Sequence, residues 1–186
     1  LLCALYCAPL LAQAELLPAY RGDLDEFDNI QRLPPGEGPA RLRMGRRPGW
    51  APGEPRPVIL IDTSAWVEFL RGTGSATCQA VHDLLGGDIA ICDPVRVEVL
   101  AGARDDQHLN DLRRLLARAG VVTTTPADYE TAASLYRTCH RQGETVRRLV
   151  DCLIAAAAIE ARTPILHADS DFDVLARHTP LQVVSP

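Results

Sequence analysis

Five carboxylates have the chemistry and the positions needed to hold a divalent cation: Asp62, Glu98, Asp151, Asp169 and Asp171. Asp151 and Glu98 each lie in an otherwise apolar segment, where a lone carboxylate is costly to bury unless it is paired or binds a cation. Converging carboxylates without matching lysines or histidines repel one another and raise each other's pKa. A divalent cation relieves this repulsion, and ligation by oxygen alone favours Mg²⁺ or Mn²⁺ over Zn²⁺. Bound Mg²⁺ is able to activate water and to stabilise charge on a phosphodiester.

Three of these acids stand where predicted strands end. The apolar run 58–61 leads directly into Asp62 and is typical of a strand buried on both faces. Asp169 and Asp171 follow a second apolar strand, predicted at 164–167, after a short turn. Ligands of open parallel sheets bind at the carboxyl ends of the strands. We therefore expect these acids to share one rim of the sheet.

Each acid also has a structural explanation. Asp62 precedes Thr-Ser and suits a helix N-cap, and Asp169 suits the N-cap of the helix predicted after it. Glu98 could pair with Arg96 or with another arginine. Asp151 has the weakest structural explanation because its neighbours are so apolar, and the joint pattern is more specific than any single member.

Strands and helices alternate from Val58 onward, which predicts an α/β sandwich with a mainly parallel central sheet. The predicted strands cover 57–62, 88–92, 121–123, 164–167 and 181–184. The predicted helices cover about 64–71, 75–86, 94–103, 106–119, 126–142, 147–162 and 171–177.

The first 57 residues differ from the rest. They hold nine of the fourteen prolines, and residues 33–57 are rich in both proline and glycine. We expect 1–57 to be a disordered N-terminal extension or sequence outside the native start, and 58–186 to form the folded domain. Residues 1–14 resemble a signal peptide, but they have no positively charged start and are too short to span a bilayer, so no membrane association is predicted.

Composition excludes several classes of protein. The net charge of −5 argues against a general nucleic-acid-coating protein, but not against an enzyme that binds nucleic acid in a local groove. All nineteen basic residues are arginine, which excludes P-loop NTPases and lysine-dependent aldolases. The six cysteines form no CxxC pair, which excludes a zinc ribbon and favours reduced thiols in the cytoplasm.

Four segments occur together in an order that is typical of one family. They cover 58–70 with Asp62-Thr-Ser, 95–102 with Glu98, 143–156 with Arg147 and Asp151, and 166–172 with Asp169-Ser-Asp171-Phe. From Val58 onward the sequence resembles a PIN-domain ribonuclease, specifically the VapC-type toxin of a type II toxin–antitoxin pair. The resemblance implies a three-layer α/β/α sandwich. It also implies an endoribonuclease that depends on Mg²⁺, with Mn²⁺ as a substitute, and hydrolyses RNA phosphodiester bonds with a metal-activated water.

The resemblance further implies roles for the acids. Asp62, Glu98 and Asp151 match the family's core acids, with Asp62 and Asp151 as direct metal ligands and Glu98 orienting or activating the attacking water. The fourth acid is either Asp171, which is also a predicted catalytic residue, or Asp169, and both are predicted metal ligands.

Two further residues support the site by the same resemblance. Ser64 matches a family hydroxyl close to the metal, although a hydroxyl at a helix start explains it equally well. Arg147, together with Arg148, contacts either the RNA backbone or a carboxylate of the antitoxin, with a solvated helix start as the alternative.

The implied partners are the RNA substrate, a VapB-type antitoxin whose C-terminal tail covers the acidic site, and a second copy of the chain. The apolar helices at 64–70 and 75–86 offer a dimer surface unless they belong to the core. Two other functions stay open: a catalytically inert PIN-fold binding module, and another Mg²⁺-dependent phosphoryl hydrolase such as a haloacid-dehalogenase-like phosphatase. The presence of every core acid argues against the first. Asp62-Thr63-Ser64 in place of Asp-x-Asp, and the lack of lysine, argue against the second.

Overall fold

The computed structural model describes residues 58–85, 87 and 89–186, so the predicted extension 1–57 lies outside the described residues. Within this part five strands form one parallel sheet in the order β3-β2-β1-β4-β5. They are β1 Ile59–Ile61, β2 Ile89–Cys92, β3 Gly120–Val122, β4 Ile165–Leu166 and β5 Val183–Val184. All five predicted strands are confirmed, with bounds shorter by one to two residues in most cases.

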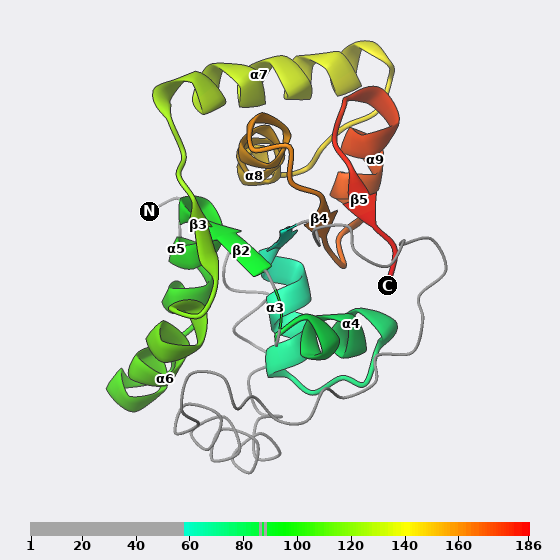
Figure 1. Ribbon diagram of the computed structural model, residues 1–186. Helices are drawn as coiled ribbons and strands as arrows, with labels where there is room; N and C mark the ends of the chain where they lie inside the picture. The colour runs from blue at the N-terminus through cyan, green and yellow to red at the C-terminus, as the bar shows by residue number, and fades with distance from the viewer. Residues whose placement is uncertain (1–57, 86, 88) are drawn as a thin grey trace, which may run out of the picture. The chain divides into compact units, whose positions relative to one another are not determined.

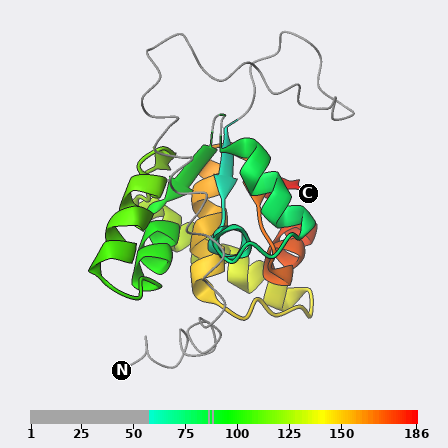
Figure 2. The same cartoon turned by 90° about the horizontal axis from the view of Figure 1, so that it is seen from below.

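Seven helices in the described part surround the sheet. They are α3 Thr63–Leu70, α4 Ala76–Leu84, α5 Asp93–Ala101, α6 Asp106–Leu116, α7 Pro126–Arg141, α8 Leu149–Glu160 and α9 Ser170–His178. Figure 1 shows α8 between the sheet and α7, with α3 and α4 on the opposite side of the sheet. Viewed at right angles in Figure 2, α5 and α6 lie side by side at one edge. The predicted three-layer α/β/α sandwich is confirmed.

The central strands are buried on both faces. Leu60 of β1 pairs with Ala90 on one side and with Ile165 on the other, and every residue of β1, β2 and β4 is buried. Continuous apolar strands are what a parallel sheet with helices on both faces requires. Burial therefore fixes the strand ends from which the functional side chains emerge.

Local sequence explains where the helices begin and which of them is buried. Pro126 opens α7, and Thr125 and Asp128 form a capping box there. Helix α8 is apolar nearly all round, as expected for a helix packed between the sheet and α7. No helix in the described ranges is both long enough and apolar enough to cross a membrane.

The apolar faces of α3 and α4 belong to the core. Trp66 and Phe69 of α3 and Val81 of α4 are at most 1% exposed within the chain. These three side chains therefore belong to the core, which is the alternative to a dimer surface. A dimer surface on α3 and α4 has to use other residues.

The chain changes direction at β1. The connection through α3 and α4 leads to β2 on one side of β1, whereas the later connection through α7 and α8 leads to β4 on the other side. A crevice forms at such a switch point, beyond the carboxyl ends of the strands. Helix α8 runs from this edge back to the start of β4, so its first turn lies near the ends of β1 and β4.

Candidate active site

Asp62 and Ser64 tie the ends of β1 and β4 together. The backbone N–H of Asp62 donates to the Leu166 carbonyl at 3.0 Å. Oδ2 of Asp62 accepts the Ser64 N–H at 2.8 Å and the Ser64 hydroxyl at 2.5 Å. The Ser64 oxygen in turn accepts the backbone N–H of Ala168, after β4, at 2.9 Å. Asp62 thus makes the N-cap contact foreseen for it, and Ser64 contacts an acid of the site.

Glu98 reaches the same edge from the middle of α5. It is half-buried, and its Oε2 accepts a hydrogen bond from Thr63 Oγ1 at 2.7 Å. No ion pair with Arg96 is recorded among the described residues, and the Arg96 Nε is buried without a partner there. Sequence reasoning did not single out Thr63. The feature that could have identified Thr63 is its position between Asp62 and Ser64, at the start of a helix that follows a strand.

Asp151 lies in the first turn of α8 and is 4% exposed. Its Oδ2 is buried and has no hydrogen-bond partner in the described part of the chain. Burial, followed by the charges of Asp62 and Asp169, raises the pKa of Asp151 to about 8. Burial likewise raises the pKa of Asp62 to about 6, although the Ser64 hydrogen bonds oppose this. The charge of Arg148 lowers the pKa of Asp151, but it does not offset burial and the neighbouring acids.

Asp169 and Asp171 are engaged differently. Asp169 caps α9, with its side chain accepting the Asp171 N–H at 3.0 Å, so the N-cap explanation is confirmed. Asp171 is 3% exposed and accepts two hydrogen bonds from Arg147, from the backbone N–H at 2.7 Å and from Nε at 2.8 Å. Arg147 Nη2 also donates to Asp169 Oδ1 at 2.5 Å, and Arg148 Nη1 lies 3.7 Å from Asp169 Oδ2. Arg147 is thus not the free helix-start arginine considered from sequence.

The predicted acids therefore gather at one edge but fall into two groups. One comprises Asp62 and Asp151, with Glu98 close enough to influence the pKa of Asp62, and the other is the Asp169–Asp171 pair bound to Arg147. Within the described residues, no three His, Cys, Asp or Glu side chains are already arranged as a metal cluster. The unpartnered Asp151 oxygen and the raised pKa values of the first group nevertheless fit a hard cation bound by oxygen. Four of the cysteines, Cys78, Cys92, Cys139 and Cys152, are free.

Comparison with known proteins agrees with this arrangement. The PIN domain family matches residues 59–178. Ribonuclease VapC11 of Mycobacterium tuberculosis is 48% identical over 132 residues, which cover 69% of this chain and 98% of the relative. Ribonuclease VapC51 of the same organism is 30% identical over 130 residues, covering 68% of this chain and 93% of the relative.

Solved structures show the same fold. VapBC2 from Rickettsia felis, bound to a DNA fragment from its promoter, aligns with a TM-score of 0.57 at 18% identity and covers 68% of this chain and 97% of the matched one. VapBC-1 from nontypeable Haemophilus influenzae aligns with a TM-score of 0.56 at 16% identity, over 69% and 97%. The chain therefore belongs to the PIN-domain family and, within it, to the VapC-type toxin ribonucleases.

Proposed function

We propose that this toxin hydrolyses RNA phosphodiester bonds at the edge formed by β1, α5 and α8, with Mg²⁺ as its cofactor and Mn²⁺ as a substitute. The observation that carries the proposal is the buried Asp151 Oδ2 without a hydrogen-bond partner, beside a second acid, Asp62, whose pKa is also raised. VapC ribonucleases with a PIN domain generally depend on a divalent metal. Oxygen ligands favour Mg²⁺ among the common cations.

Asp62 and Asp151 would hold the cation in this proposal. When bound, a divalent cation lowers the pKa of water and stabilises negative charge on a phosphate. Glu98, whose carboxylate is held by Thr63, orients the attacking water and accepts its proton. Ser64 fixes the rotamer of Asp62 through the 2.5 Å hydrogen bond and so directs the other carboxylate oxygen away from itself.

Asp169 and Asp171 contribute charge to the same edge. The negative charges of both raise the pKa of Asp151. Asp171 remains the better candidate for the fourth acid because it is buried, whereas the side chain of Asp169 is 14% exposed. In this proposal Arg147 binds Asp169 and Asp171. The part of its side chain that stays exposed would contact RNA or the antitoxin.

A VapB-type antitoxin is the natural partner, because structural relatives are VapBC assemblies. We propose that its tail covers the acidic edge and that the toxin forms a homodimer. Two exposed apolar side chains beside the site, Val97 on α5 and Leu149 on α8, are 66% and 64% exposed and offer contacts to such a tail. The free thiols and the RNA substrate both suit the cytoplasm.

Residues 58–186 are proposed as the complete catalytic domain, with 1–57 dispensable for it. The family match at 59–178 supports this division, and so does the 98% coverage of VapC11 by 132 residues of this chain. A protein that starts at Val58 should fold and cleave RNA as well as the full chain does. An unfolded or inactive truncation would show that the extension is needed.

The test of the function is cleavage of total RNA by the purified protein in Mg²⁺ and in EDTA, with Asp151→Asn alongside. Asp173→Asn is the matched control, because Asp173 lies nearby on α9 but its side chain is 58% exposed. Discrete fragments are expected from the wild type and the control in Mg²⁺ alone. Cleavage that persists in EDTA or in Asp151→Asn would reject the mechanism. Antitoxin binding with neither cleavage nor metal binding would identify an inert binding module.

A further inference from the structure

We propose that Arg147 serves as a built-in cation for the Asp169–Asp171 half of the site, so that the protein binds one divalent cation rather than two. That single cation lies at Asp62 and Asp151. The inference rests on the proposed function for the location of the metal, but it concerns the number of cations and the part played by Arg147.

Arg147 already binds both acids that a second cation would need as ligands. Both carboxylate oxygens of Asp171 accept hydrogen bonds from Arg147, one from the backbone N–H at 2.7 Å and one from Nε at 2.8 Å. Oδ1 of Asp169 accepts a third from Nη2 at 2.5 Å. Such charge-assisted contacts are stronger than neutral hydrogen bonds, and the planar guanidinium matches carboxylate geometry. Arg147 is therefore a positioning residue that neutralises these two acids.

The segment that carries Arg147 is held at both ends of α9. At the start of the helix Arg147 binds Asp171, and at its end Glu144 accepts hydrogen bonds from Arg177 and His178. Val146, between these two contacts, is 2% exposed. The Arg147 side chain is 62% exposed, but these anchors fix the backbone that carries it, so less ordering is needed for it to pair with the acids.

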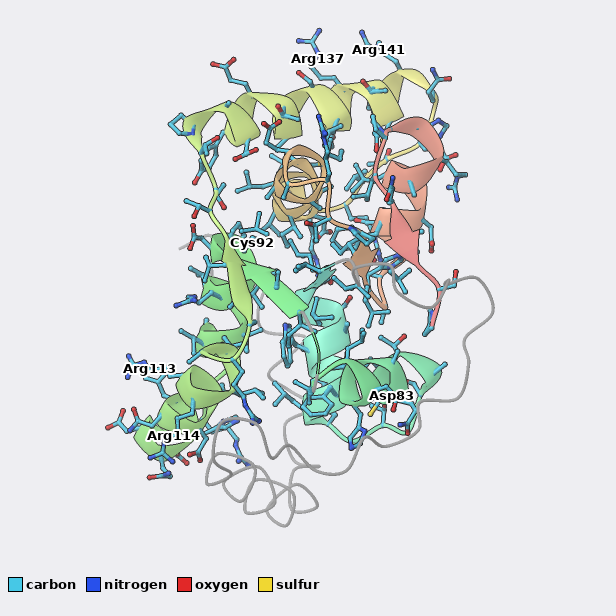
Figure 3. All side chains as sticks on the ribbon, in the orientation of Figure 1. Asp83, Cys92, Arg113, Arg114, Arg137 and Arg141 are labelled. Atoms are coloured by element: carbon cyan, nitrogen blue, oxygen red, sulfur yellow. The ribbon has the colours of Figure 1, made fainter. Side chains whose placement is uncertain are left out.

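The two halves of the site differ in whether their buried carboxylates already have partners. Asp171 is satisfied by hydrogen bonds from one arginine, whereas Asp151 keeps a buried oxygen with no partner in the described structure. A second cation at Asp169 and Asp171 would have to displace the guanidinium and offset the loss of its ion pair with the buried Asp171 carboxylate. A first cation at Asp151 displaces nothing. Other arginines, such as Arg137 and Arg141, point outward from α7 in Figure 3.

Counting bound Mn²⁺ tests the inference without using RNA. Calorimetric titration, with electron paramagnetic resonance to measure free Mn²⁺, should give one ion per chain for the wild type. Arg147→Gln frees the Asp169–Asp171 pair and should bind a second ion. Arg147→Lys keeps one positive charge at the same position and should remain at one. Two ions in the wild type, or one ion in Arg147→Gln, would overturn the proposal.

A second variant covers the case in which Arg147→Gln does not fold. Asp169→Asn should change the Mn²⁺ affinity of the single site by less than about tenfold, because Asp169 acts there only through its field. A larger loss would make Asp169 a ligand and overturn the proposal. Asp173→Asn again controls for removing one acidic charge from α9. A protein that binds one Mn²⁺ but cuts no RNA would reject the proposed function and leave this inference standing. Two bound ions in a protein that cuts RNA would support the proposed function and reject this inference.

Discussion

The Thr63 hydroxyl donates a hydrogen bond to Glu98 Oε2 at 2.7 Å, across 35 positions of sequence. This contact fixes an acid of α5 against Thr63, the first residue of α3. Asp62 and Ser64, on either side of Thr63, make the contacts that link β1 to the end of β4. These three consecutive residues therefore link β1, α5 and the end of β4 at the acidic edge.

Thr63→Val should lower RNA cleavage by about tenfold while the protein stays folded. The change removes one hydroxyl at nearly constant volume, so Glu98 loses the contact that orients it, and one partly buried hydrogen bond is worth about 1 kcal/mol. Cleavage rates in Mg²⁺ measure the loss of activity, and the midpoint of urea unfolding shows whether the protein stays folded. Thr63→Ser keeps the hydroxyl and is the control. Equal activity of Thr63→Val and wild type would show that Glu98 does not depend on this contact.

The fold could be predicted from the sequence because its elements carry strong local signals. The run Ile59–Ile61 is wholly apolar and α8 is apolar nearly all round, so their burial did not depend on unknown contacts. Four of the five strands are shorter than predicted, because an apolar residue beside a strand has the same pattern whether or not it pairs. Asp62, Asp151 and Asp171 were identified because acids at strand ends or in apolar helices are conspicuous.

The contacts among the acids could not be predicted in the same way. Arg147 and Asp171 are 24 positions apart, and their pairing depends on how the segment between α7 and α8 lies along α9. Arginine at a helix start is common on solvated surfaces, so the sequence position of Arg147 does not distinguish an arginine paired with acids from a solvated one. Thr63 was overlooked for a similar reason, since Thr at a helix start has an ordinary capping explanation.

Ser64→Ala should destabilise the protein by about 1–2 kcal/mol and reduce cleavage. The variant removes the hydroxyl that donates to Asp62 and accepts from the Ala168 N–H, which leaves both groups short of a partner. Chemical unfolding measures the loss of stability, and a Mn²⁺ titration shows whether Asp62 still binds metal. Ser64→Thr retains the hydroxyl and controls for the change. A variant as stable and active as the wild type would mean that water replaces both contacts.

Without metal, the wild type should lose stability as the pH rises from about 4 to about 8. The folded-state pKa values of Asp151 and Asp62, about 8 and about 6, are raised above the ordinary aspartate value of 3.8. A carboxyl whose pKa rises on folding binds protons more tightly in the folded state. Its contribution is therefore complete below the unfolded pKa and is lost as the pH rises through the folded pKa.

Asp151→Asn isolates this effect. In EDTA at pH 8 the variant should be more stable than the wild type by at least about 1 kcal/mol, and the difference should shrink towards pH 5. Urea unfolding at the two pH values measures the difference, with Asp173→Asn to control for the loss of one surface charge. A variant that is less stable than the wild type at pH 8 in EDTA would show that Asp151 has a structural role instead.

Mg²⁺ should raise the melting temperature more at pH 8 than at pH 5.5. Protons and the cation compete for Asp62 and Asp151, whose carboxyls are largely protonated at the lower pH because burial raises their pKa values. Once Mg²⁺ is well above its dissociation constant, each tenfold increase adds about 1.4 kcal/mol, so a titration at each pH gives the affinity. Asp151→Asn should lose most of the shift, and NaCl at equal ionic strength controls for screening. An equal shift at both pH values, or one reproduced by NaCl, would place the cation away from these two acids.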